Sequence, residues 1–215
     1  MPKRVDHEQR RRQIAAAVWR IAATRGLPAA TLREVAAEAG VSMRLVQYYF
    51  TTKEQLLVYA FEQGARSAGE RMRASFAALG RPPEPVDVVR ICLLELLPTD
   101  EESLMLARVH AAYYAAALTD AALANADAED PQQQLENVLA TQLRAGQAAG
   151  DVPAGIDPAL EARGLAALAA GLSSIMLVGG RTAEDAIALV RYHVDRLFPG
   201  AAADSWAGSG PDADR

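Results

Sequence analysis

One stretch of the sequence, TLREVAAEAGVSMRLVQYYFTTKEQLL, constrains the fold more than any other part of the chain. It begins with Thr31 and Glu34, a T-x-x-E pair in which each side chain can satisfy a backbone N–H at a helix start. Apolar residues follow at helical spacing, namely Leu32, Val35, Ala36 and Ala39. The pattern predicts a helix with one apolar face.

A tight turn and a second helix are predicted directly after it. Gly40 stands where a helix end favours a residue that takes positive φ, and Ser42 is a suitable N-cap for the next helix. That helix, residues 43–49, is too short to be stable alone in water, so packing must hold it. Val46 and Phe50 supply its inward face. Its outward face carries Met43, Arg44, Gln47 and Tyr48.

A short helix that is held from behind and presents such side chains suits the major groove of DNA. The distribution of charge supports this interpretation. Up to Leu57 the chain has 10 lysines and arginines against 5 acids, whereas the remainder has 12 against 22, for a formal net charge of −5. The basic segment coincides with the predicted helix-turn-helix, so an acidic protein can still present a positive surface to phosphate.

The pattern T-x-x-E-V-A-x-x-A-G-V-S, a helix ending in Y-Y-F and the continuation T-K-E-x-L-L resemble the DNA-binding domain of the TetR family of transcriptional regulators. The resemblance implies a homodimeric, ligand-responsive repressor that reads a palindromic operator. It also implies that Arg33 lies beside the base-reading residues and that Lys53 touches the DNA backbone. The predicted DNA-binding residues are Thr31, Arg33, Ser42, Met43, Arg44, Gln47, Tyr48, Tyr49 and Lys53.

Helical patterns and helix-ending residues continue to residue 199 and predict an all-α fold of about nine helices. After a disordered start over residues 1–6, helices are expected at 7–25, 31–39, 43–49, 53–79, 85–97, 99–118 with a short continuation to 125, 131–150, 158–179 and 182–198. The predicted domains are a helix-turn-helix head, 1–52, and a helical ligand-binding and dimerisation body, 53–199. The tail, 200–215, is low in large apolar residues and is predicted to be disordered.

The body also has residues suited to a small-molecule pocket, because a few polar side chains stand among otherwise apolar helices. The resemblance implies a pocket framed by the fourth to seventh helices. The predicted pocket residues are Phe61, Met72, Phe76, Cys92, Leu96, His110, Tyr113 and Tyr114. The two tyrosines would equally serve as core residues with their hydroxyls at the edge, and the sequence does not identify the ligand.

The last two helices carry apolar residues at alternating spacings of three and four, which is typical of packing seams. The helix over 158–179 is apolar nearly all round and therefore needs cover on more than one face. Two such helices from each of two subunits would form a four-helix bundle about a two-fold axis. The predicted interface residues are Leu165, Leu168, Leu172, Ile175, Ile187, Val190, Val194 and Leu197.

Other function classes find less support. The three histidines, His7, His110 and His193, stand far apart without metal-binding spacing, and no phosphate loop or nucleophile motif is present. We therefore expect no catalytic residues, no metal and no cofactor. A single cysteine excludes an intrachain disulfide and favours the cytoplasm.

A membrane partner is not expected. The 17 uncharged positions between Arg163 and Arg181 fall short of the roughly 20 residues of a spanning helix, and nothing resembles a signal peptide. The alternative that remains is a helical small-molecule-binding protein or enzyme whose head has lost DNA binding.

Overall fold

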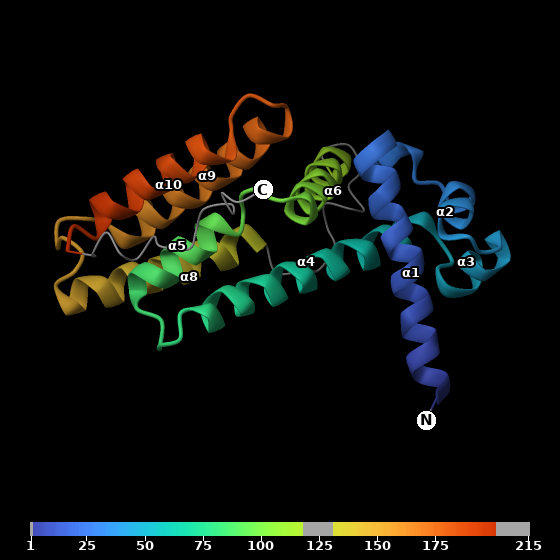
Figure 1. Ribbon diagram of the computed structural model, residues 1–215, viewed down its shortest axis with the longest axis horizontal. Coiled ribbons are helices and arrows are strands. Elements are labelled where there is room, and N and C mark those ends of the chain that lie inside the picture. Colours follow the sequence, from blue (N-terminus) through green and yellow to red (C-terminus); the bar gives the residue numbers. More distant parts are fainter. Residues whose placement is uncertain (1, 118–130, 201–215) are drawn as a thin grey trace, which may run out of the picture. The chain divides into compact units, whose positions relative to one another are not determined.

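The computed structural model of the protein describes residues 2–117 and 131–200, without the side chains of residues 2–6, 65, 113, 116, 117 and 131. Over these residues the chain is helical and has no strand, which confirms the all-α class (Figure 1). Its elements are α1 (Pro2–Arg25), the 3-10 turn η1 (Leu27–Ala29), α2 (Leu32–Ala39), α3 (Met43–Tyr49), α4 (Lys53–Ala78), α5 (Pro85–Leu94), α6 (Glu101–Ala117), α8 (Pro131–Ala149), α9 (Pro158–Leu177) and α10 (Ala183–Leu197).

Two predicted helix boundaries differ from the structure by more than two residues, and two predicted segments lie where the structure gives no description. The first helix begins at Pro2 instead of residue 7, and proline suits a first helical position because its missing N–H is not needed there. Helix α5 ends at Leu94, three residues before the predicted end. The expected continuation to residue 125 and the tail from residue 201 lie outside the described residues.

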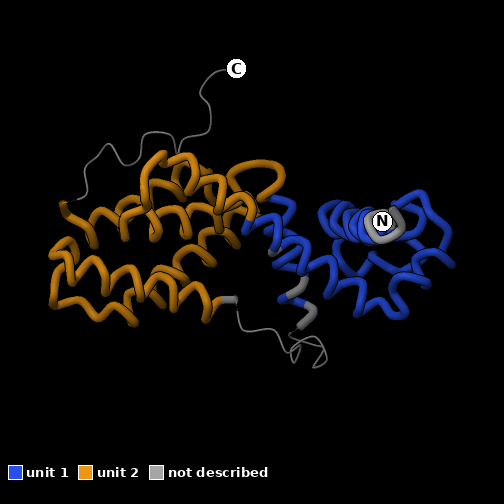
Figure 2. The backbone as a smooth tube through the Cα atoms, turned by 90° about the horizontal axis from the view of Figure 1, so that it is seen from below, with its two compact units in different colours: residues 1–69, 104–126 blue, residues 70–103, 127–215 orange. Residues whose placement is uncertain are grey.

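The chain divides into two compact units, coloured separately in Figure 2. Unit 1 comprises Met1–Gly69 and Leu104–Ala126, and unit 2 comprises Glu70–Ser103 and Asp127–Arg215. The division therefore falls inside α4, and most of α6 belongs with the N-terminal helices. The predicted domains, with a boundary at residues 52 and 53, divide the chain by function and stay a prediction.

Unit 1 is built around a core to which α1, α2, α3, α4 and α6 all contribute. The largest side chains without exposed surface include Ile14, Ile21 and Leu56, while Phe50 is 1% exposed. Val109 of α6 belongs to the same cluster. The Trp19 indole N–H donates to the Ala60 carbonyl across 3.1 Å, which fixes α1 against α4.

The helix-turn-helix has the predicted caps, with one correction. The Thr31 and Ser42 hydroxyls accept the third N–H of their helices, across 3.2 Å in each case. Gly40 has φ 66°, so it takes the left-handed conformation that ends α2. The Glu34 carboxylate does not close the predicted capping box, because it accepts from Arg25 at 2.8 Å.

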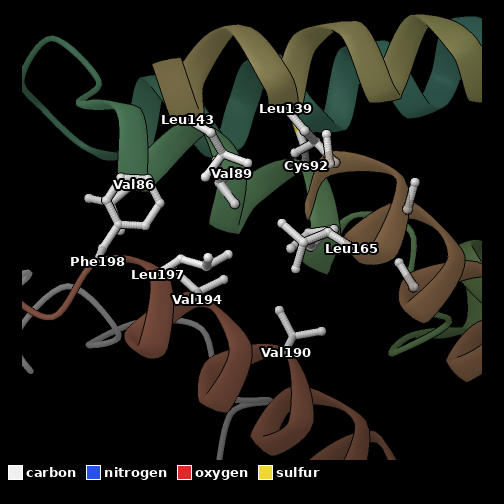
Figure 3. Close-up of a cluster of buried hydrophobic side chains, with 14 of the residues drawn as sticks. Val86, Val89, Cys92, Leu139, Leu143, Leu165, Val190, Val194, Leu197 and Phe198 are labelled. Atoms are coloured by element: carbon white, nitrogen blue, oxygen red, sulfur yellow. The ribbon is translucent and has the colours of Figure 1, made fainter. Parts of the chain in front are cut away.

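Unit 2 has its own apolar core, shown in Figure 3, formed by α5, α8, α9 and α10. The cluster includes Leu139 and Leu143 of α8 and Val190 and Val194 of α10, and none of the four has exposed surface. Gly146 lets the Val152 side chain pack closely on α8, since a Cβ there would lie 2.6 Å from a Val152 methyl carbon.

Two ion-pair groups fix the start and the end of α5 within unit 2. Asp87, which has no exposed surface, accepts from the backbone N–H of Glu84 at 2.9 Å and pairs with Arg90 at 2.8 Å. Burial lowers the pKa of Arg90 from its usual value. At the other end, Glu95 pairs with Arg71 at 3.0 Å and accepts from Ser75 at 2.6 Å, which ties α5 to the second half of α4.

Candidate nucleic-acid interface

Helix α3 is held on one side by the core of unit 1. Val46 has no exposed surface, and the Phe50 ring that follows the helix lies 5.4 Å from the Tyr59 ring of α4, centroid to centroid. The backbone N–H of Phe50 donates to the Val46 carbonyl at 2.8 Å, so the end of the helix is fixed as well. This packing supplies the stability that seven residues cannot provide alone.

The other side of α3 is open to solvent. Arg44 and Gln47 are exposed, Met43 is 43% exposed and Tyr48 is 70% exposed. An exposed tyrosine offers a partner both an apolar ring and a hydroxyl group. The structure therefore brings Met43, Arg44, Gln47 and Tyr48, all predicted to contact DNA, onto one accessible side of α3.

The remaining predicted DNA-binding residues flank this surface in sequence and in unit 1. Thr31, Arg33 and Ser42 are exposed, while Tyr49 and Lys53 are half-buried. A capping hydroxyl accepts an N–H and still has its own proton to donate, so Thr31 and Ser42 can bind a phosphate oxygen without losing their caps.

Lys53 is the first residue of α4, where the helix start favours anions. The neighbouring carboxylate, Glu54, has a pKa below its usual value, first because its own backbone N–H donates to it and then because Thr52 does. The Glu54 carboxylate therefore already accepts hydrogen bonds from groups at the N-terminus of α4. Lys53 adds a cation to the same turn, which is suited to a phosphate.

A ring cluster beside α3 was missed in the sequence. His7 of α1 lies 6.2 Å from Tyr48 and 5.5 Å from Tyr49, and the two tyrosine rings are 5.1 Å apart, all between centroids. Forty residues separate His7 from the tyrosines, so no local pattern could reveal the contact. The histidine would have been found only by expecting α1 to pack along the end of α3.

The predicted small-molecule residues fall into both units. In unit 1, Phe61 of α4 is stacked on His110 of α6 with centroids 5.6 Å apart, and His110 meets Tyr114 edge-on at 4.7 Å. Desolvation lowers the pKa of His110 although the residue is exposed to solvent, so the imidazole is neutral at pH 7. The side chain of Tyr113 lies outside the described residues.

The other four pocket residues belong to unit 2. Met72 packs against its core and Cys92 is a member of that core. Burial raises the pKa of the Cys92 thiol to about 11, so the thiol is protonated and unreactive. Phe76 is half-buried and Leu96 is 40% exposed.

The predicted dimer seam lies largely inside the protomer. The buried core of unit 2 includes Leu165, Leu172, Val190, Val194 and Leu197. Leu168 and Ile187 pack against that core while partly exposed, and Ile175 is 43% exposed. Spacings of three and four mark a packing seam, but they do not tell whether the partner helix belongs to the same chain.

A second apolar seam covers the exposed side of α9. Leu160 is 66% exposed and Val178, at the helix end, is 82% exposed. Between them the exposed residues at alternating spacings of four and three are Gly164, Ala167, Gly171 and Ser174. A Cβ at either glycine would meet no atom within 4 Å, so the protomer itself does not require glycine there.

Helix α9 is also long and apolar enough to cross a membrane when only length and composition are considered. It is the one such helix among the described residues. In the same part of the chain, no group of three or more histidine, cysteine or acidic side chains is placed to hold a metal ion.

Comparison with known proteins matches both parts of the chain. Residues 14–60 match the model for the bacterial regulatory proteins of the tetR family, and residues 85–199 match the C-terminal domain of BetI-type transcriptional repressors. The HTH-type transcriptional regulator PksA of Bacillus subtilis (strain 168) is 38% identical over 104 residues, which are 48% of this chain and 49% of PksA. The chain thus spans about half the length of this curated relative.

Solved structures share the fold over nearly the whole chain. A putative TetR-family regulator from Rhodococcus sp. has a TM-score of 0.74 at 26% identity, covering 88% of this chain and 99% of that one. A putative regulator from Saccharomonospora viridis, solved in complex with choline, has a TM-score of 0.76 at 22% identity. The match covers 87% of this chain and 96% of that one. Two family models that together extend from the helix-turn-helix to residue 199 assign the family: the chain belongs to the TetR family of bacterial transcriptional regulators, with a BetI-type C-terminal domain.

Proposed function

We propose that this chain is a ligand-responsive repressor that binds a palindromic operator as a homodimer. The observation that carries the proposal is the geometry of α3. Its apolar side is fully buried in the core of unit 1, and its other side presents exposed Arg44, Gln47 and Tyr48. Packing fixes the position of this helix in unit 1. Its outward side chains are therefore held ready to contact base edges when the helix lies in the major groove.

The candidate DNA-binding residues take different roles in this proposal. Arg44 and Gln47 read base edges, with Arg33 beside them, because these long side chains have paired donors or a donor and an acceptor. Met43 makes an apolar contact. The residues that position the DNA backbone are Thr31, Ser42, Tyr48, Tyr49 and Lys53.

The exposed seam of α9 supports the homodimer. Small residues at Gly164, Ala167 and Gly171 leave the helix surface flat, so a second copy can approach closely. Leu160 and Val178 would then lose their exposure to water at the two ends of the seam. An isologous contact of this kind has a two-fold axis, and two heads related by such an axis match a palindromic DNA site.

The cluster of Phe61, His110 and Tyr114 supports an effector site at α4 and α6. A neutral imidazole can both donate and accept a hydrogen bond, and the two flanking rings supply apolar surface. Helix α4 runs from Lys53 at the DNA-binding end to Ala78 in unit 2 without interruption. A ligand that changes the position of α4 would therefore alter operator affinity, by about 1 to 3 kcal/mol for typical coupling.

The proposed place of action is the cytoplasm, without a membrane partner and without an enzymatic activity. The apolar character of α9 then reflects its cover by the protomer core on one side and by a second subunit on the other. The residual alternative is a helical small-molecule-binding protein or enzyme whose head has lost DNA binding.

The test is binding of purified full-length protein to a DNA fragment from upstream of its own gene. Fluorescence anisotropy against the same fragment with scrambled sequence measures specificity. We expect roughly a thousandfold preference for the specific fragment at physiological salt, and a footprint with two-fold symmetry. Equal affinity for both fragments, with Arg44→Ala indistinguishable from wild type, would contradict sequence-specific binding and favour the alternative.

A further inference from the structure

The structure places a histidine from α1 beside the candidate DNA-reading helix. The His7 ring contacts both Tyr48 and Tyr49, with interplanar angles of 45° and 70°, and the two tyrosines meet edge-on at 82°. His7 and Tyr48 are both exposed. The three rings thus form one continuous aromatic surface that extends the outward face of α3 toward α1.

The position of His7 is fixed by its neighbours along α1. Glu8 accepts from the Tyr59 hydroxyl at 2.7 Å, and the Arg11 guanidinium lies 4.1 Å from the centre of the Tyr59 ring. Tyr59 is only 6% exposed and belongs to the core of unit 1. The first turns of α1 are therefore anchored on α4, and His7 is held beside α3.

The charged groups around His7 suit an anionic partner. Helix α3 carries Arg44 and no carboxylate, and the first turn of α4 carries Lys53 beside Glu54, which is engaged by its own backbone N–H and by Thr52. On α1, Glu8 is shared between Tyr59, Arg11 and Arg12, both arginines at 3.7 Å, and Arg10 donates to Gln13. Among the described side chains, these nearby carboxylates already have partners, so an external phosphate would be the acidic partner of His7.

We propose that His7 is an additional operator-binding residue, whose ring fixes Tyr48 and Tyr49 against one another and whose protonated imidazole donates to a DNA phosphate beside the major groove. The inference rests on the proposed operator binding. Protonation is compatible with the ring cluster, because the His7 ring lies 5.5 Å from the Tyr49 centroid and aromatic rings attract cations at such distances. Side chains at the edge of a reading helix are placed for phosphates, which flank the groove on both sides.

The proposal predicts that a proton is taken up when the protein binds DNA. Because the complex then holds more protons than its separate parts, operator affinity rises as pH falls. The chain has three histidines. His110 lies in the Phe61 cluster, and His193 meets the Tyr192 ring on α10. Because the three histidines lie in different places, single substitutions can identify the one that takes up the proton.

The experiment measures operator binding of the full-length protein by anisotropy at pH 6 and pH 8, each over a series of salt concentrations. Wild type is compared with His7→Ala, with His7→Phe and with His193→Gln as the matched control. Thermal unfolding followed by circular dichroism checks that each variant is folded, as expected for substitutions at an exposed residue.

At pH 6 we expect both His7 variants to bind about tenfold more weakly than wild type and to have a salt slope smaller by about 0.9, the value of one phosphate contact. At pH 8 we expect His7→Phe to match wild type within about twofold, because the ring cluster is retained, and His7→Ala to be weaker than both. His193→Gln should follow wild type throughout.

Each part of the proposal can fail separately. Unchanged salt slope and pH dependence in both His7 variants would exclude the phosphate contact. Equal operator affinity of His7→Ala and His7→Phe at pH 8 would exclude a role of the His7 ring in positioning Tyr48 and Tyr49. Absence of specific binding by wild type at either pH would instead contradict the proposed operator binding itself.

Discussion

Helices α3 and α9 both leave one side open to solvent, but the two exposed surfaces differ in chemistry. The surface of α3 carries long polar and aromatic side chains on a helix of 7 residues, whereas that of α9 carries glycine, alanine, serine and aliphatic residues along a helix of 20. The first surface projects donors and acceptors beyond the backbone. The second brings the backbone itself close to whatever covers it.

The difference indicates two kinds of partner. Long side chains with paired hydrogen-bonding groups discriminate base edges at a distance from the helix. Short residues give no such reach, but they permit two helices to pack with little loss of side-chain entropy. A surface for DNA and a surface for a second subunit can therefore be told apart by the length and polarity of the exposed side chains.

The largest expected effect comes from a charge on the exposed seam of α9. Ala167→Arg should prevent dimer formation and lower operator affinity at least about a thousandfold, because the interface would have to bury an unpaired charge. Sedimentation velocity should then show a folded monomer. Ala145→Arg, at an exposed position of α8, serves as the control; a dimeric Ala167→Arg would remove the α9 surface from the proposal.

The adjacent residue should behave differently. Leu168 packs against the core of its own protomer, so Leu168→Glu should lower the free energy of unfolding by about 3 kcal/mol through loss of packing and cost of desolvation. Urea unfolding followed by circular dichroism measures the change. If Leu168→Glu were as stable as wild type, the assignment of the two sides of α9 would have to be reversed.

A smaller effect is expected at the base-reading surface. Arg44→Ala should weaken operator binding by about 2 kcal/mol and relax the preference at the bases it contacts, without changing the oligomeric state. Binding to a set of single-base operator variants measures the preference. A uniform loss over all of these variants would assign Arg44 to the DNA backbone instead.

The smallest effect should come from Lys53. Lys53→Ala should weaken binding to all sequences alike, by about 1 kcal/mol, and reduce the salt slope by about 0.9. Specific and scrambled fragments titrated over a range of salt concentrations provide the measurement. A change in base preference for this variant, without one for Arg44→Ala, would exchange the roles of the two residues.

Local chemistry explains how much of the helix-turn-helix was predictable. The hydroxyl caps and the left-handed Gly40 depend on residues within a few positions of each other, and all three are found in the structure. The Glu34 carboxylate was placed wrongly because it accepts from the Arg25 guanidinium instead of a backbone N–H, and Arg25 reaches it only through the packing of α1 on α2.

Features that depend on tertiary packing were not predictable in the same way. The heptad-like spacing on α9 identified a seam, but only the structure shows that Leu165 and Leu172 use it within the protomer. The contact of His7 with Tyr48 also requires knowing that the N-terminal part of α1 lies beside α3. Sequence periodicity gives the face of a helix, while the identity of the neighbour has to come from the fold.

The membership of α6 in unit 1 has a consequence for exchanging parts between regulators. Val109 completes the core of the N-terminal helices, and Arg108 donates to the Ala23 carbonyl at 3.4 Å. A head transplanted at residue 52 would leave these partners behind with the donor's body. A graft that keeps the specificity and the stability of this head has to carry the matching surface of α6 with it.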